Sequence, residues 1–183
     1  MLLISDKKQT TAEPQRRLSV QLGFKLVRHF LNPLNRLIQI GFKTRKKGKT
    51  AIGRAMSHHL RNALRGDYPA IRIDPTQAKI SEGNLSQVSI HSVERKDDTI
   101  YLTWDPPRAY YKDFCSWDDE LILCVYDVEA GNAAINEQQV IRQQERMELQ
   151  LPSVLQGKVL HLYLMLHDRN QRIVSKSQYL GVF

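Results

Sequence analysis

The chain has 183 residues, of which 42% are hydrophobic and 25% are charged. These proportions are typical of a globular protein and exclude an intrinsically disordered chain, and at this length a hydrophobic core needs no metal ion or disulfide. No apolar run approaches the roughly 18 residues of a membrane span, and the apolar start at residues 1–4 is too short for the core of a signal peptide. We therefore expect neither a transmembrane segment nor a signal peptide, and a cytoplasmic location by default.

Charge divides the chain into two parts. The formal net charge is +8, but residues 1–72 carry +13 and residues 73–183 carry −5. Such asymmetry indicates two parts that have different partners or that attract each other. Together with the patterns below, it predicts a disordered tail at residues 1–9, a basic helical region at residues 10–67 and a β-sandwich domain at residues 68–183.

The basic region contains three helical patterns. Apolar residues recur every three to four positions from residue 18 to residue 31, which predicts a helix buried over much of its circumference. Asn32 is expected to cap a second helix that starts at Pro33 and ends at Gly41. Thr50 is expected to cap a third helix that Gly66 terminates.

The third helix has an apolar face and a basic face. Ile52, Ala55, Met56, His59, Leu60 and Ala63 follow helical spacing on one side, and Arg54, His58, Arg61 and Arg65 follow it on the other. With the loop before the helix, the basic face forms a candidate surface for nucleic acid or another anion. Its residues are Lys43, Arg45, Lys46, Lys47, Lys49, Arg54, Arg61 and Arg65.

An ordinary solvated helix face is the alternative for this basic surface. Binding to duplex DNA would add about −0.9 to the slope of log affinity against log salt for each phosphate neutralised. No aromatic residue interleaves the basic run, so it has no stacking platform for single strands. The sequence also has no helix-turn-helix or zinc-finger signature.

After residue 67 the hydrophobic period falls towards two, which predicts about seven short strands. Ile100, Leu102 and Trp104 alternate and should share one buried face, and the nearly all-apolar residues 121–125 predict a central strand covered on both faces. Leucines at 160, 162, 164 and 166 alternate with His161, Tyr163, Met165 and His167. This second face is either partly covered by the helices or a mixed solvent face. The last strand is expected at residues 173–180.

The predicted fold class is therefore α+β, with about three N-terminal helices followed by an antiparallel β-sandwich of the immunoglobulin or fibronectin type III kind. One stretch supports the second name. Residues 100–107 read Ile-Tyr-Leu-Thr-Trp-Asp-Pro-Pro, which resembles the second strand of a fibronectin type III domain, where a Trp ends an alternating strand before prolines.

A second resemblance covers most of the chain. It is carried by the segments 11–15 (Thr-Ala-Glu-Pro-Gln), 30–34 (Phe-Leu-Asn-Pro-Leu), 40–42 (Ile-Gly-Phe), 47–51 (Lys-Gly-Lys-Thr-Ala), 62–64 (Asn-Ala-Leu), 80–85 (Ile-Ser-Glu-Gly-Asn-Leu) and 177–181 (Ser-Gln-Tyr-Leu-Gly). In this order they resemble an uncharacterised bacterial family, domain of unknown function 6266. The resemblance implies a common fold and no particular activity.

A loop between two predicted strands is rich in aromatic residues. Tyr110, Tyr111, Phe114 and Trp117 fall within eight residues. Loops at the end of a β-sandwich often carry recognition, and Tyr and Trp are enriched in binding hot spots. The loop is thus either a partner-binding tip or a set of aromatic side chains tucked beneath it as a small satellite core.

Sequence patterns for chemistry are missing. Gly48-Lys49-Thr50 lacks the upstream glycine of a phosphate-binding loop. His58 and His59 are adjacent and point about 100° apart on a helix, so they cannot share a metal ion. The two cysteines are too few for a four-ligand zinc site. We predict no catalytic, cofactor-binding or metal-binding residues.

These patterns predict how the chain is built and leave its specific function open. The first hypothesis is a non-enzymatic structural or protein-interaction module with an unidentified protein partner. The alternative is a nucleic-acid-associated protein that binds the phosphate backbone through the basic region. A third hypothesis is a sugar binder or hydrolase that uses the Trp117 loop.

Overall fold

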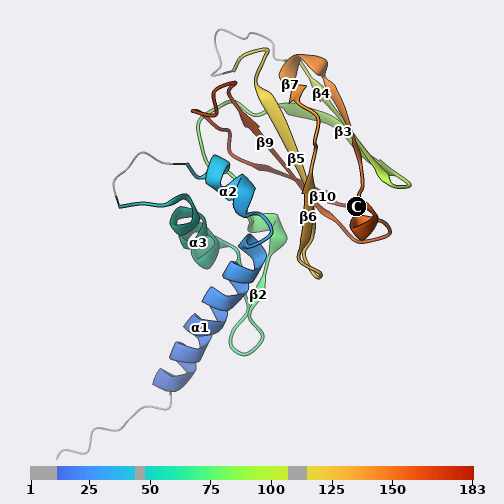
Figure 1. The fold of residues 1–183 in the computed structure, drawn as a ribbon. Helices are drawn as coiled ribbons and strands as arrows, with labels where there is room; N and C mark the ends of the chain where they lie inside the picture. Colours follow the sequence, from blue (N-terminus) through green and yellow to red (C-terminus); the bar gives the residue numbers. More distant parts are fainter. Residues whose placement is uncertain (1–11, 44–47, 107–114) are drawn as a thin grey trace, which may run out of the picture.

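The structure is a computed structural model and describes residues 12–43, 48–106 and 115–183. It has the predicted α+β class, with helices first and antiparallel sheets after them (Figure 1). The helices are α1 (Ala12–Leu31), α2 (Asn35–Gly41) and α3 (Ala51–Asn62). The tail predicted at residues 1–9 lies outside the described residues.

Two larger antiparallel sheets follow, together with one small hairpin. The hairpin after α3 consists of β1 (Leu64–Arg65) and β2 (Arg72–Ile73). The three-stranded sheet has the order β3 (Ser89–Lys96), β4 (Thr99–Asp105) and β8 (Arg146–Gln150). The five-stranded sheet has the order β10 (Gln178–Val182), β9 (His161–His167), β5 (Glu120–Asp127) and β6 (Asn132–Ile135), with β7 (Val140–Ile141) also paired to β5. Short 3₁₀ turns are η1 (Pro75–Gln77), η2 (Arg142–Gln144) and η3 (Ser153–Leu155).

The two larger sheets contribute alternate residues to one hydrophobic cluster. Ile100, Leu102 and Trp104 of β4 are buried in it, as their spacing predicts. Leu121, Leu123 and Val125 of β5 and Leu162, Leu164 and Leu166 of β9 supply the opposite side. Strand β5 lies between β9 and β6, which confirms the central strand predicted at residues 121–125. The immunoglobulin or fibronectin name for this pair of sheets stays a prediction.

The other face of the five-stranded sheet is covered by the helices. Tyr163 and Met165 of β9 are fully buried in a second cluster with Val27, Phe30 and Ile38 of α1 and α2. This confirms that the helices cover the second face of residues 160–167. Each large apolar side chain buried there contributes about 1.5–3 kcal/mol.

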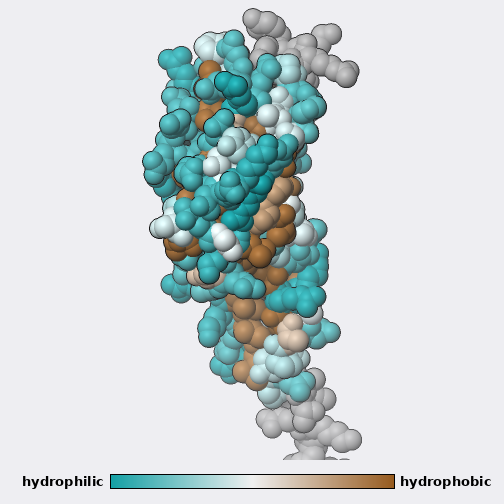
Figure 2. All heavy atoms as spheres, turned by 90° about the vertical axis from the view of Figure 1, so that its right-hand side faces the viewer, coloured by the Kyte–Doolittle hydropathy of each residue, from teal (hydrophilic) through white to brown (hydrophobic). Residues whose placement is uncertain are grey.

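Helix α1 departs from its prediction in its first half. Leu18, Val20 and Phe24 are 44%, 53% and 50% exposed, whereas Val27 and Phe30 are buried. A 20-residue helix is about 30 Å long, and only its last turns reach the sheet (Figure 1). Figure 2 shows an apolar surface in the lower half of the molecule, at the height of α1 in Figure 1. The expected burial around most of this helix is therefore wrong for its N-terminal part.

The predicted start of the second helix is also wrong. The N–H of Asn32 donates to the carbonyl of Arg28, so Asn32 still belongs to the hydrogen-bond ladder of α1 and cannot open the next helix. Asn32 and Pro33 instead form a turn, and Leu34 precedes α2 without a side-chain cap. Gly41 is the last residue of α2. A Cβ atom at Gly41 would lie 2.1 Å from the carbonyl oxygen of Ile80, so close approach of the chain requires this glycine.

Two further boundaries differ from the prediction. Helix α3 ends at Asn62, and Gly66 has a φ of +82° in the turn of the β1–β2 hairpin, so it does not terminate the helix. Strand β10 begins at Gln178, because residues 173–177 follow the turn after β9 with only isolated bridges.

Candidate binding surfaces

Helix α3 is held by hydrogen bonds on its inner side, and its outer side forms the first candidate surface. Thr50 accepts a hydrogen bond from the N–H of Gly53, which confirms the predicted cap. The buried His59 donates from Nδ1 to the carbonyl of Ala55 at 2.8 Å and accepts at Nε2 from the N–H of Lys79 at 3.3 Å. Burial lowers the pKa of His59 to about 4, so the ring is neutral at pH 7. The segment around Lys79 is thereby tied to α3.

An open groove of about 790 Å³ runs between α3 and this segment. We call it the basic groove. Its lining residues are Gly48, Lys49, Thr50, Gly53, Arg54, Ser57, His58, Arg61, Asn62, Lys79 and Glu82. Four of these are cations at pH 7, and Glu82 is the one carboxylate among the described lining residues, with Oε1 3.6 Å from Nζ of Lys79. Burial lowers the pKa of His58, so its ring adds little charge at neutral pH.

The two arginines of the basic groove are held by backbone carbonyls. Nη1 of Arg54 donates to the carbonyls of Phe42 at 2.7 Å and Lys43 at 3.0 Å, which satisfies acceptors after the end of α2. Arg61 donates from Nε to the carbonyl of Ser57 at 2.9 Å and from Nη2 to its hydroxyl at 3.0 Å. Both arginines therefore line the groove while their guanidinium groups are hydrogen-bonded to nearby backbone carbonyls.

The groove contains three of the eight cations predicted from the sequence, namely Lys49, Arg54 and Arg61. Lys43 instead donates to the carbonyl of Gln171 at 3.4 Å. Arg65 lies in β1, where its Nε is 3.5 Å from a carboxylate oxygen of Asp74. The other three predicted cations lie outside the described residues: Arg45, Lys46 and Lys47.

Lys79 was not predicted because no local pattern connects it with α3. Twenty residues separate it from His59 in sequence, and the hairpin between them returns the chain to the helix. An isolated lysine in a loop has no signal of its own, so only tertiary packing reveals its place in the groove.

The second surface is the loop that ends in β5. Trp117 is 53% exposed, so its ring is not tucked beneath the loop. It borders a shallow hollow of about 400 Å³ with Asp118, Gln139, Ile141, Gln144 and Arg169. We call this surface the tryptophan tip. The other aromatic residues predicted for it lie outside the described residues: Tyr110, Tyr111 and Phe114.

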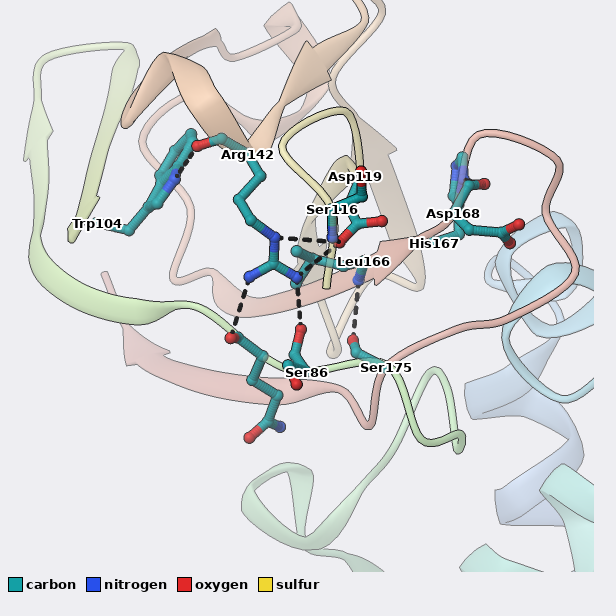
Figure 3. A network of polar contacts seen from close by, with 10 residues as sticks. Ser86, Trp104, Ser116, Asp119, Arg142, Leu166, His167, Asp168 and Ser175 are labelled. Atoms are coloured by element: carbon teal, nitrogen blue, oxygen red, sulfur yellow. Dashed lines mark hydrogen bonds and ion pairs between the residues drawn. The ribbon is translucent and has the colours of Figure 1, made fainter. Parts of the chain in front are cut away.

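A buried ion pair supports the tryptophan tip (Figure 3). Arg142 and Asp119 have side chains 1% and 2% exposed, and Nε and Nη2 of the arginine lie 3.1 Å and 3.0 Å from Oδ2 of the aspartate. The same oxygen accepts the N–H of Ser116 at 2.7 Å. Burial raises the pKa of Asp119, against the opposing effect of the Ser116 N–H and the guanidinium.

The same arginine connects the tip with the three-stranded sheet. Its guanidinium donates to the carbonyls of Ser86 at 2.7 Å and Gln87 at 3.3 Å. Its own carbonyl accepts the indole N–H of Trp104 at 2.8 Å. The residues on either side of Trp117 are thus anchored to both sheets. This role of Arg142 could not be predicted, because residues 142–146 are all polar and resemble an exposed turn.

The described residues offer few groups for other chemistry. Burial raises the pKa of the Cys124 thiol to about 12, so it is protonated at neutral pH. Within residues 12–43, 48–106 and 115–183, no three His, Cys, Asp or Glu side chains are grouped so that they could hold a metal ion. No helix in these ranges is long and apolar enough to cross a bilayer.

A comparison with curated proteins finds no match to this sequence. The profile of a family of unknown function, DUF6266, matches residues 4–181, which is nearly the whole chain and agrees with the resemblance found in its motifs. The chain therefore belongs to the DUF6266 family.

Proposed function

We propose that this chain is a non-enzymatic interaction module that recognises a protein partner through the tryptophan tip. The observation that carries the proposal is the half-exposed ring of Trp117 on a loop whose neighbours are held by the Arg142–Asp119 ion pair. A rigid aromatic anchor loses little conformational freedom on binding, and Trp is among the residues enriched in binding hot spots.

The surroundings of the ring suit a polypeptide. Gln139 and Gln144 carry amide donors and acceptors beside the indole, and Arg169 and Asp118 carry opposite charges. A hollow with one apolar anchor and several hydrogen-bonding groups matches the anatomy of a protein interface, where a hydrophobic centre is surrounded by a polar rim.

Three buried nucleophiles or bases support a role without catalysis. Cys124 is buried and protonated, and both ring nitrogens of His59 are engaged by the backbone. At His167, Nδ1 lies 2.9 Å from the carbonyl of Asp168, and Nε2 lies 3.7 Å from the carboxylate of Glu120. Cys124 is thus buried away from solvent, and the two histidines have structural partners, where a catalytic group would need to face substrate.

A phage-displayed random peptide library tests the proposal. Peptides are selected on the wild-type chain and measured against Trp117→Ser and Val159→Ser. Val159 is 67% exposed next to the start of β9, outside the tryptophan tip, and serves as a matched control. Selected peptides should bind the wild type and Val159→Ser equally and lose about thirtyfold or more in affinity for Trp117→Ser, the loss of a hot-spot residue.

Two outcomes would contradict the proposal. Peptides that bind all three proteins equally would show that the tip is not the preferred surface. A glycan array with signals that vanish in Trp117→Ser, combined with no enrichment of peptides, would assign the ring to sugar binding instead.

A further inference from the structure

We propose that the basic groove binds the phosphate groups of an anionic ligand. This inference concerns a different surface from the tryptophan tip and does not depend on the function proposed for it. It rests on the concave shape of the groove, on its charge and on the backbone hydrogen bonds made by its two arginines.

Positive charge is in excess in the groove. Lys49, Arg54, Arg61 and Lys79 line it, against the single carboxylate of Glu82. Among the described residues, no carboxylate lies within ion-pair distance of Lys49, Arg54 or Arg61. Arg65, just beyond α3, does form an ion pair, with Asp74. Unneutralised cations that converge on a hollow raise the local concentration of anions.

The first turn of α3 adds to this field. Gly48, Lys49, Thr50 and Gly53 line the groove at the start of the 12-residue helix. Backbone N–H groups at a helix start carry a partial positive charge and favour phosphate oxygens. The helix start and the four side chains therefore act on the same space.

Both walls of the groove are already in place. Arg54 and Arg61 are held by the carbonyls of Phe42, Lys43 and Ser57. The opposite wall is fixed by the Lys79 N–H on His59 and by the Glu82 N–H, which donates to the carbonyl of Gly41 at 2.9 Å. A ligand would thus bind to an organised site, and ordering that site would cost little conformational entropy.

An ordinary solvated basic helix face lacks these features. Helix α1 provides the comparison, because it carries Arg16, Arg17 and Lys25 at exposed positions. In the basic groove the cations instead stand on two walls, with Lys79 across from α3. This arrangement indicates an anion-binding site and differs from an exposed helix face that only contacts solvent.

The phosphate groups can come from a nucleic-acid backbone or from a small phosphate compound. The groove volume of about 790 Å³ lies in the range of small-molecule sites, and the open shape also admits a backbone strand. None of the described residues that line the groove is a Phe, Tyr or Trp on which a base could stack. Recognition is therefore at the level of phosphate, and binding to a duplex would be independent of its sequence.

The test compares two variants that remove the same charge. Lys49→Gln/Lys79→Gln takes two cations from the groove and leaves the structural arginines intact. Arg16→Gln/Lys25→Gln takes two from exposed positions of α1. Fluorescence anisotropy with a labelled DNA duplex, and calorimetry with pyrophosphate, measure the two phosphate sources at about 50 mM salt.

We expect the groove variant to lose about tenfold in affinity for at least one probe, and the slope of its log affinity for a duplex against log salt to become less steep by roughly 2. The α1 variant should change affinity by about twofold or less, since distant charges are screened. Glu82→Gln should tighten binding, because it removes the carboxylate that competes for Lys79.

The two probes distinguish the sources. Pyrophosphate bound without the duplex indicates a small phosphate compound, and duplex bound without pyrophosphate indicates a backbone. Equal losses in both double variants would reduce the effect to net charge and overturn the proposal. Undetectable binding of both probes by the wild type would overturn it as well.

Discussion

Replacement of Arg142 by Met should destabilise the fold strongly. The substitution leaves the carboxylate of Asp119 buried without its cation, and loss of one partner of a buried pair costs about 3–5 kcal/mol. It also removes the donors to the carbonyls of Ser86 and Gln87, each worth about 1 kcal/mol or more when left unsatisfied. We therefore expect a loss of about 5 kcal/mol, a large part of the roughly 5–15 kcal/mol that stabilises a domain.

Urea unfolding followed by far-UV circular dichroism measures this loss at pH 7. Arg146→Met is the matched control, because Arg146 is exposed on β8, and it should change the free energy of unfolding by less than about 0.5 kcal/mol. The double substitution Arg142→Met/Asp119→Leu should recover about 2 kcal/mol relative to Arg142→Met, since no buried charge remains.

The pH dependence gives an independent check on the cause. Without the guanidinium, burial raises the pKa of Asp119 further, so the native state of Arg142→Met binds a proton that the unfolded state releases. The deficit of this variant relative to wild type should therefore shrink as the pH falls from 7 towards 4. A loss under about 1 kcal/mol at pH 7, or a deficit independent of pH, would refute the reasoning.

Three further predictions concern other parts of the chain. The pKa of His59 is lowered to about 4, so the unfolded state takes up a proton near pH 6.5 that the native state does not. The free energy of unfolding should therefore fall by about 3 kcal/mol between pH 7 and 4. Urea midpoints of His59→Gln should vary less with pH than those of the wild type. Gly41→Ala should lower the free energy of unfolding by about 3 kcal/mol because its Cβ has no room. Gly157→Ala has open space but a φ of +64° and should lower it by about 1 kcal/mol, as thermal unfolding would show. Iodide should quench the fluorescence of the exposed Trp117 and not that of the buried Trp104, so Trp117→Phe should abolish quenching. Quenching that persists in Trp117→Phe would mean that Trp104 is exposed to solvent.

The sheet core was predictable because its signal is local. Alternation of Ile100, Leu102 and Trp104 in a strand puts all three on one face whatever the partner strand is. The cap at Thr50 was predictable for the same reason, since the accepting hydroxyl of Thr50 and the donating N–H of Gly53 lie three residues apart. The short strands β6 and β7 carry no such alternation over their few residues, and the sequence did not reveal them.

The features that could not be predicted from the sequence depend on how distant parts of the chain pack. Helix α1 has the same apolar spacing at Leu18 as at Phe30, and only the position of the sheet decides that one is exposed and the other buried. The place of Gly41 as a contact point is set by a loop about forty residues later. The Arg142–Asp119 pair and the Lys79 wall of the basic groove likewise join residues whose spacing follows no helical or strand period.

The burial of both faces of β5 bears on how the chain is synthesised. Phe30 of α1 packs edge-on against Tyr126 of β5, whose hydroxyl donates to the Phe30 carbonyl, and 96 residues separate the two. At a translation rate of roughly 5–20 residues per second, this interval lasts about 5 to 20 s. During that time the helices are already made, and the strands that cover their apolar sides are not. A chaperone that shields these apolar sides would therefore act before β5 and then β9 are made and can pack against the helices.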